Sequence, residues 1–208
     1  MFRSTDSGAT WASFGSSPAA LPVINALAVD PTSSFPLYAG TGAGAYGVRR
    51  HQDGSLKWET NNALASRRIF AIALDPASGA TLYAGTDAGL YRSVDGGLSW
   101  SAVTAGLAAS AIYALLFDPH SPSILYAGTD SGFFESADGG SSWTAMNEGL
   151  TNLAVLAVAI APTPNPDLYA GTAGTSVFRF GASSGSTQRL PIVPAHRAAH
   201  PRSVPARP

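Results

Sequence analysis

The 208-residue chain contains no cysteine and little charge. The absence of cysteine excludes disulfides and thiolate metal sites, and it leaves the redox compartment undecided. Charged residues make up 12% of the chain, about half of the usual ~25% of globular proteins. There is also no run of ~20 apolar residues, so a transmembrane helix is excluded and no membrane partner is expected.

The few charges are unevenly distributed. Residues 1–180 carry eight Arg or Lys and thirteen Asp or Glu, whereas residues 181–208 carry four Arg and no acid. A mildly acidic body argues against a nucleic-acid partner. From Leu190 onward the chain is rich in proline, alanine and arginine. Residues 181–208 are therefore expected to form a disordered tail, and a shifted reading frame is a second explanation.

A five-residue phrase, Leu-Tyr-Ala-Gly-Thr, occurs four times. It begins at Leu37, Leu82, Leu125 and Leu168, so that its tyrosines are 45, 43 and 43 residues apart. A fixed period near 43 predicts a repeat architecture. Features that recur in every copy are expected to be structural. The chemistry of the protein is therefore sought where the copies differ.

Each copy reads as a series of short strands. An apolar run that ends in a proline precedes each phrase, at residues 24–31, 69–76, 112–119 and 155–162. Runs that are apolar on both faces predict an inner strand packed between neighbours. The phrase itself reads as a second strand, whose small residues after the tyrosine allow the next layer to approach closely. The four equivalent tyrosines are therefore expected to be packing residues rather than nucleophiles.

A motif of the form Ser-x-Asp-x-Gly-x-x-Trp follows the third strand. Aspartate and tryptophan are five residues apart in four places: Asp6 and Trp11, Asp53 and Trp58, Asp95 and Trp100, Asp138 and Trp143. The motif predicts a turn whose carboxylate accepts from N–H groups two residues on, with Gly97 and Gly140 supplying a positive φ. Each Trp is expected to begin the fourth strand and pack on the turn. The spacing does not match a helix-loop-helix calcium loop, so no metal is expected.

This motif is the Asp box, and the whole unit resembles the BNR/Asp-box repeat. Sialidases, xyloglucanases, sortilins and photosystem II assembly factors share that repeat. The resemblance covers residues 1–180 and implies an all-β propeller of about four four-stranded antiparallel blades. The family contains both enzymes and non-enzymes, so the fold does not decide the activity. It often acts outside the cytoplasm, which implies an extracellular or periplasmic location, with a cytoplasmic one as the alternative.

The sequence leaves two ways of ending the propeller open. The N-terminal hairpin around Asp6 would complete the last blade and close a four-bladed ring. Alternatively, residues 183–188 are a decayed Asp box, the last blade has its own outer strand, and the chain is part of a larger ring. The oligomeric state is left open.

Residues that interrupt the repeat are the candidate ligand-binding residues. Arg67 and Arg68 precede one inner strand, where other copies carry Ser110-Ala111 and Leu153-Ala154. By analogy with propellers, the loops before the inner strand and after the second strand open on one face. That arrangement would gather Arg67, Arg68, Asp87 and Asp130 around one mouth. Solvated surface charge is the alternative interpretation.

No catalytic set is apparent. A glycosidase needs two carboxylates at a fixed separation, and the only glutamates are Glu59, Glu135 and Glu148. A sialidase-like site would also need a Tyr–Glu pair, which the sequence does not offer. Residues 42–47 spell G-x-G-x-x-G, but strand and turn follow instead of a helix, so no cofactor is expected. We predict a non-catalytic scaffold or binding module for a protein or glycan partner; the alternative is a fragment of a sialidase- or xyloglucanase-like glycoside hydrolase.

Overall fold

A computed structural model describes residues 2–13, 22–30, 37–50, 56–61, 64–107, 110–161, 167–174, 176–181 and 187–190. These residues form an all-β structure of four four-stranded antiparallel sheets and one two-stranded hairpin. The predicted fold class and sheet type are therefore confirmed at that level. Within these ranges, no helix is long and apolar enough to cross a membrane.

Consecutive strands pair with one another in every sheet. The N-terminal hairpin contains β1 (Phe2–Arg3) and β2 (Ala12–Ser13). The first sheet contains β3 (Ile24–Val29), β4 (Leu37–Thr41), β5 (Gly44–Arg50) and β6 (Leu56–Asn61). The second contains β7 (Ile69–Leu74), β8 (Leu82–Thr86), β9 (Gly89–Ser93) and β10 (Ser101–Val103). The third contains β11 (Ile112–Phe117), β12 (Leu125–Thr129), β13 (Gly132–Ser136) and β14 (Thr144–Ala145), and the fourth β15 (Val155–Ile160), β16 (Leu168–Thr172), β17 (Ser176–Phe180) and β18 (Thr187–Leu190).

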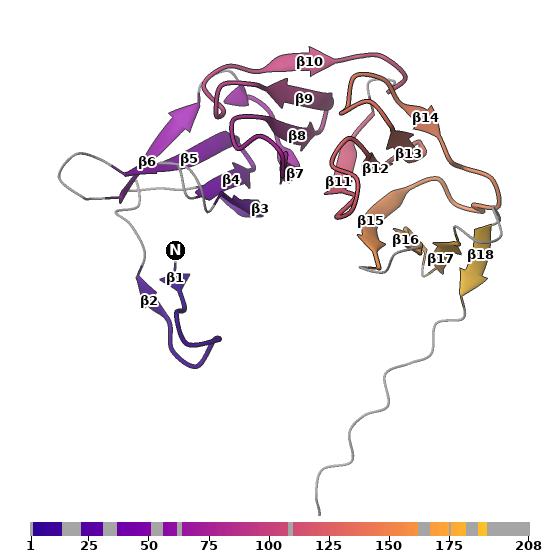
Figure 1. The fold of residues 1–208 in the computed structure, drawn as a ribbon, viewed down its shortest axis with the longest axis horizontal. Helices are drawn as coiled ribbons and strands as arrows, with labels where there is room; N and C mark the ends of the chain where they lie inside the picture. The colour runs from indigo at the N-terminus through magenta and orange to yellow at the C-terminus, as the bar shows by residue number, and fades with distance from the viewer. Residues whose placement is uncertain are drawn as a thin grey trace, which may run out of the picture.

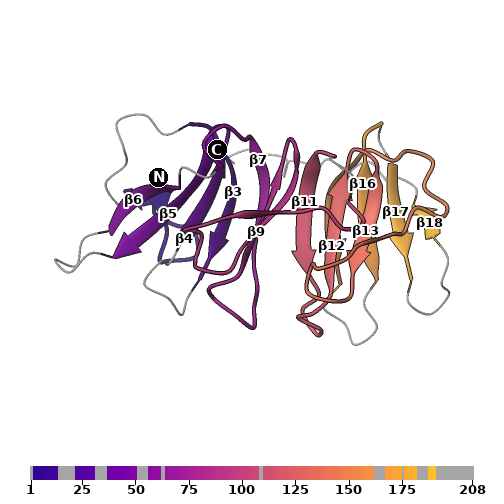
Figure 2. The same ribbon diagram turned by 90° about the horizontal axis from the view of Figure 1, so that it is seen from above.

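The four sheets lie side by side along an arc (Figure 1). The first strand of each sheet is on the inner side of the arc, and the fourth strand is on the outer side. In the perpendicular view, the strands run across the thickness of the arc (Figure 2). The arrangement is propeller-like, but the sheets that the described residues form do not close into a ring.

The fourth sheet has its own outer strand. β18 pairs with β17 over four residue pairs, from Phe180 and Thr187 to Val177 and Leu190. The sheet thus extends past residue 180, where the sequence analysis placed the end of the repeats. β1 and β2 form a separate two-stranded sheet, so the hairpin does not complete the fourth sheet in this structure. Asp53, residues 182–186 and residues 191–208 lie outside the described residues.

Neighbouring sheets pack by inserting one side chain against a glycine. The first residue of each following inner strand, Ile69, Ile112 or Val155, is fully buried. Each lies on the glycine of the preceding Leu-Tyr-Ala-Gly-Thr strand. A Cβ added to Gly40 would be 2.5 Å from Ile69 Cγ2, one on Gly85 2.8 Å from the Ile112 oxygen, and one on Gly128 2.9 Å from Val155 Cγ1. We call the inserted residue the knob and the glycine its socket. The expected close approach of the next layer is confirmed.

The repeated tyrosines complete these interfaces. Tyr38, Tyr83 and Tyr126 are buried, and Tyr169 is partly buried. The Tyr83 hydroxyl donates a hydrogen bond to the Gly139 carbonyl of the next sheet. Burial is the main reason that the pKa of Tyr83 is raised above its ordinary value of 10. A buried, protonated phenol of this kind is a packing residue, as the repetition predicts.

The sockets give a paired prediction. Gly128→Ala should lower the free energy of unfolding by ~1–3 kcal/mol, because the new methyl group overlaps the knob of the fourth sheet. Gly171→Ala alters the same position of the fourth sheet, where a Cβ would be 3.6 Å from its nearest neighbour, Ala157. In a single chain that is not associated with a second copy, it should leave stability unchanged or raise it by up to ~1 kcal/mol. Urea denaturation of both variants provides the measurement, and equal losses would refute the knob-and-socket description.

Candidate functional site

The three described Asp-box motifs, at residues 4–11, 93–100 and 136–143, form one kind of turn, which we call the Asp turn. In the second sheet, Asp95 Oδ1 accepts from the Ser99 N–H at 2.9 Å and Asp95 Oδ2 from the Ser99 hydroxyl at 2.5 Å. The Ser93 hydroxyl donates to Asp95 Oδ1 at 2.8 Å and accepts from the Gly97 N–H at 2.8 Å. The carboxylate therefore binds the residue four positions on, not two as predicted. Positive φ angles at Gly96 and Gly97 fold the chain back and cause this difference.

The Asp turns hold their carboxylates ionised. Hydrogen bonds, led by the side-chain hydroxyl four residues on, lower the pKa of Asp6, Asp95 and Asp138 to about 2. An ionised carboxylate only accepts hydrogen bonds, so these groups cannot serve as general acids at neutral pH. Across the described ranges, no group of three or more His, Asp or Glu side chains is arranged to hold a metal ion. The predicted structural role of these three aspartates agrees with this geometry.

The lowered pKa values predict a pH dependence with a definite sign. Each folded-state pKa lies below the ordinary value of 3.8, so the stabilisation is present above pH ~4 and is lost as the pH falls toward ~2. Asp138→Asn removes one titrating group and should make the melting temperature fall less steeply over that window. Ser142→Ala, which deletes the leading hydroxyl donor, should reproduce part of the effect. Thermal melts between pH 7 and pH 2 test this, and parallel declines in variant and wild type would contradict it.

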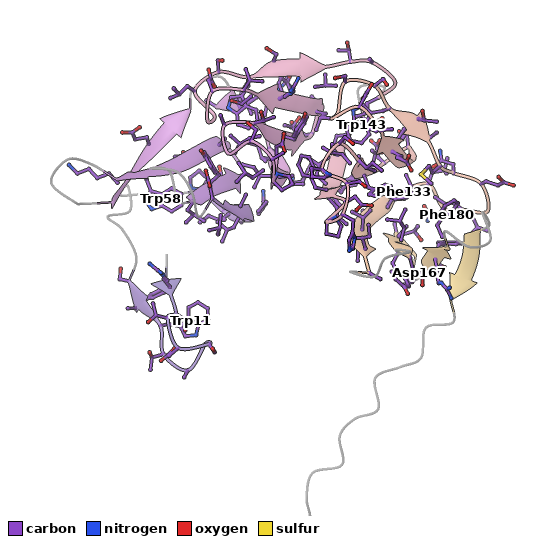
Figure 3. All side chains as sticks on the ribbon, in the orientation of Figure 1. Trp11, Trp58, Phe133, Trp143, Asp167 and Phe180 are labelled. Atoms are coloured by element: carbon purple, nitrogen blue, oxygen red, sulfur yellow. The ribbon has the colours of Figure 1, made fainter. Side chains whose placement is uncertain are left out.

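The tryptophans do not share one environment. Trp143 is 6% exposed, and its Nε1 donates to the Gly140 carbonyl at 3.2 Å. Trp100 makes the equivalent bond to Gly97 at 3.1 Å, and Trp58 is also buried. Trp11 is 63% exposed, so the predicted packing is wrong for this residue. None of the other described strands pairs with its hairpin, and Figure 3 shows Trp11 apart from the packed sheets.

The candidate ligand-binding residues lie at one end of the sheets. The Arg68 carbonyl accepts a hydrogen bond from the Asp87 N–H at 3.0 Å. The Arg67 carbonyl accepts one from the N–H of Gly44, in the first sheet, at 2.9 Å. The same pairing joins the loop before the inner strand to the loop after the second strand in every sheet. The donor and acceptor pairs are Gly42 and Val23, Asp87 and Arg68, Asp130 and Ala111, and Ala173 and Ala154. We call this end of the arc the loop face.

The charged side chains of the loop face point largely into solvent. Arg68, Asp87 and Asp130 are exposed, and Arg67 is partly buried. None of the four forms an ion pair with another described residue. Asp130 Oδ2 accepts from the Ala111 N–H at 3.3 Å, and the Ser110 and Ser131 hydroxyls are 2.7 Å apart. The loop face therefore offers two guanidinium groups, two carboxylates and hydroxyls.

A second set of residues that vary among the four copies lies next to the loop face. The pairing of every inner strand shifts at its second residue, which is a bulge: Asn25, Phe70, Tyr113 and Leu156. We call these four residues the bulge row. The rings of Phe70 and Tyr113 are 5.2 Å apart and tilted by 55°. Asn25 Nδ2 donates to the Ile69 carbonyl at 2.8 Å.

The sequence analysis missed the bulge row. A signal was present, because the flanking positions are nearly invariant among the copies: Ile or Val before, and Ala after, the variable residue. A Phe or Tyr within an apolar strand, however, has the pattern of a core residue. Both aromatic side chains are only partly buried in the structure. They are therefore an aromatic surface on the inner side of the arc, within three residues of the loop face.

The position of Glu135 departs from the repeat. Equivalent strands carry Arg92, which lies over the Tyr83 ring at 5.8 Å, and Arg179, which binds Asp167 at 3.1 Å. Glu135 lies opposite Tyr126 in the register of β12 and β13, so the structure does contain an adjacent Tyr–Glu pair that the sequence analysis did not find. Burial, followed by the Asp118 carboxylate, raises the pKa of Glu135 above its ordinary value of 4.5. Tyr126 is buried and stacked on Phe133, which leaves the pair out of reach of a substrate.

A cavity between the third and fourth sheets is too small for a ligand. Its volume is about 10 Å³, and its walls are apolar, including Phe133, Met146 and Phe178. That volume corresponds to about one water molecule, whereas ligand pockets typically measure ~300–1,000 Å³. Figure 3 shows Phe133 and Phe180 in this region. A ligand would therefore bind on the surface of the arc rather than in this cavity.

Comparisons with known proteins support the fold. No protein-family model and no curated protein matches the chain. An ancestral GH74 enzyme matches 91% of this chain with a TM-score of 0.72 and a sequence identity of 21%. The GH74 xyloglucanase from Xanthomonas campestris matches 93% of the chain with a TM-score of 0.67 and a sequence identity of 23%. The extracellular domain assigned to a hybrid two-component system of B. thetaiotaomicron matches 82% of the chain with a TM-score of 0.64 and a sequence identity of 12%. The chain spans 28%, 34% and 25% of these proteins, respectively. It is thus similar in fold to segments of β-propeller-like GH74 enzymes and of an extracellular domain of a two-component system.

Proposed function

We propose that the chain is part of an Asp-box propeller and binds a glycan without catalysing its cleavage. The proposal depends on one observation: the residues that differ among the copies gather at the loop face and in the bulge row. Arg68 and Asp87 lie in one pair of loops, Phe70 follows Arg68 closely in the chain, and the Phe70 ring contacts Tyr113 of the next sheet. The residues that repeat stabilise the fold, whereas the variable residues of the loop face and the bulge row are available to contact a ligand.

The chemistry of this end suits a sugar. A pyranose ring has an apolar surface of C–H groups and a rim of hydroxyls. Partly exposed aromatic rings cover apolar surface at little entropic cost, while a few convergent polar groups fix orientation. Phe70 and Tyr113 would cover the apolar surface of the sugar. Its orientation would be fixed by the polar groups of Arg67, Arg68, Asp87 and Asp130. The similarity to GH74 enzymes, one of them a xyloglucanase, makes a β-glucan the first ligand to test.

The same comparisons support a proposal about location. A similar structure from B. thetaiotaomicron is an extracellular domain. Soluble polysaccharides are also found outside cells. We therefore place the protein outside the cytoplasm as part of this proposal.

Calorimetric titration with xyloglucan oligosaccharides tests the binding proposal. Wild type should bind, and Tyr113→Ala and Arg68→Ala should each weaken binding by about tenfold, which is ~1.4 kcal/mol. Trp11→Ala and Arg3→Ala are matched controls, because both residues are exposed on the separate hairpin. Equal losses in controls and test variants, or no binding by wild type to any glycan in a polysaccharide panel, would overturn the proposal. Binding of a protein through the same residues would replace the glycan with a protein partner.

A second candidate function is glycoside hydrolysis, and one observation favours it. Asp87 and Asp130 occupy equivalent positions at the loop faces of adjacent sheets, so this end presents two carboxylates. Two carboxylates are what a glycosidase requires. Release of reducing ends from xyloglucan, or turnover of aryl-sialosides, that is lost in Asp87→Asn and Asp130→Asn would establish catalysis. The absence of turnover by a folded, glycan-binding chain would support the non-catalytic proposal.

A further inference from the structure

The knob-and-socket contact occurs three times within the chain, and its two halves remain uncovered at the two ends of the arc. Ile69, Ile112 and Val155 are knobs that lie on Gly40, Gly85 and Gly128. The first sheet carries a fourth knob, and the fourth sheet carries a fourth socket. Neither has a partner sheet within the described residues.

The first sheet presents the knob half of the contact. In the second sheet, Ile72 packs against Tyr38 of the sheet before it and is 8% exposed. The equivalent residue of the first sheet is Leu27, which is 51% exposed, and Val29 on the same face is 65% exposed. Ile24, the fourth knob, belongs to the same strand. We call Ile24, Leu27 and Val29 the knob face, and the N-terminal hairpin leaves it open.

The fourth sheet presents the socket half. A Cβ added to Gly171 would meet only Ala157 of its own sheet, at 3.6 Å, whereas one on Gly128 would be 2.9 Å from the knob of the next sheet. Ala157 and Ala159 are exposed and Tyr169 is partly buried. The equivalent alanines and tyrosine of the second sheet, Ala71, Ala73 and Tyr83, are buried. We call Ala157, Ala159, Tyr169 and Gly171 the socket face.

We propose that the socket face of one copy binds the knob face of a second copy. The two faces are the separated halves of a contact that the chain already makes three times, so their shapes and small-residue pattern match. The named residues of both faces are uncharged, so hydrophobic burial would drive association. The charge nearest to Tyr169 in the strand register, Arg179, is paired with Asp167 at 3.1 Å. Because each copy has one of each, the contact is head-to-tail. Two such contacts between two copies close a ring, and this inference does not depend on the proposed glycan binding.

Light scattering of the size-fractionated chain tests the proposal over a range of concentrations. Wild type should have at least twice its 21.2 kDa chain mass, with the fraction of monomer rising on dilution. Leu27→Lys puts a charge on the knob face, and Gly171→Val fills the socket; each should give a monomer. Leu27 is exposed, and a side chain added at Gly171 would meet only Ala157, so the monomers should keep the wild-type circular dichroism spectrum. A wild type of 21.2 kDa at every concentration would overturn the proposal.

Mixing the two variants tests the head-to-tail geometry. Leu27→Lys retains an intact socket face, and Gly171→Val retains an intact knob face. An equimolar mixture should therefore form a one-to-one dimer, although each variant alone is monomeric. A contact between two identical faces would not be restored by mixing. A mixture that stays monomeric would thus overturn head-to-tail assembly even if wild type is a dimer.

Discussion

Trp143→Ala is expected to lower the free energy of unfolding by ~3–5 kcal/mol, the usual cost of removing a buried tryptophan. Trp143 is 6% exposed and packs with Tyr83, Leu107 and Phe134 between the second and third sheets. Its indole N–H bonds the Gly140 carbonyl, so truncation also leaves that acceptor without its donor. Denaturant unfolding followed by far-UV circular dichroism gives the value, since removal of Trp143 alters the fluorescence signal.

Trp11→Ala is the matched control for this prediction. It removes the same residue from the same motif, but Trp11 is 63% exposed. Its loss should change stability by less than ~0.5 kcal/mol, as expected for a surface substitution. Trp100→Ala should lie between the two, because Trp100 is partly buried. A loss below 1 kcal/mol for Trp143→Ala would contradict its packing role.

Ile112→Ala should cost ~2–5 kcal/mol, the range for truncating a fully buried aliphatic side chain. Ile112 is fully buried, and it is the knob that fills the Gly85 socket between the second and third sheets. Its removal leaves a cavity whose walls belong to two sheets, so neither sheet can close it alone. Urea denaturation gives the loss in stability.

Ile24→Ala is the control at the equivalent repeat position. Ile24 begins the first inner strand but faces no preceding sheet among the described residues, and it is only partly buried. The monomeric chain should lose less than ~1.5 kcal/mol, because the removed methyl groups were already partly hydrated. Equal losses at Ile24 and Ile112 would show that the knobs do not carry the interfaces between sheets.

The strands and their packing could be predicted because they repeat. The Leu-Tyr-Ala-Gly-Thr phrase places an aromatic residue, a small residue and a socket on one strand, and four copies make the pattern visible. The burial of Tyr83 and the close contacts at Gly85 both follow from it. The sequence pattern predicts the packing of such strands correctly because each copy forms the same kind of interface with the next sheet.

Features that depend on position within the arc could not be predicted in the same way. Trp11 has the motif of Trp143, but no neighbouring sheet covers it. The Tyr126–Glu135 pair arises from strand register, which residue spacing alone did not reveal. The bulge row was missed because a bulge turns one residue of a strand away from its neighbours, and an apolar pattern does not show that turn.

Hydrogen exchange of the Leu27→Lys chain, measured by mass spectrometry, tests the central claim that interfaces between sheets stabilise the arc while its ends are open. β12 and β16 share the sequence Leu-Tyr-Ala-Gly-Thr, and both are flanked by two strands, so local sequence and strand pairing are matched. Of the two, β12 alone is covered by a following sheet within the part of the chain that the structure describes. The account predicts that amides of β12 exchange more slowly than those of β16, as slowly as global unfolding allows. Equal protection of β12 and β16 in this chain would contradict it.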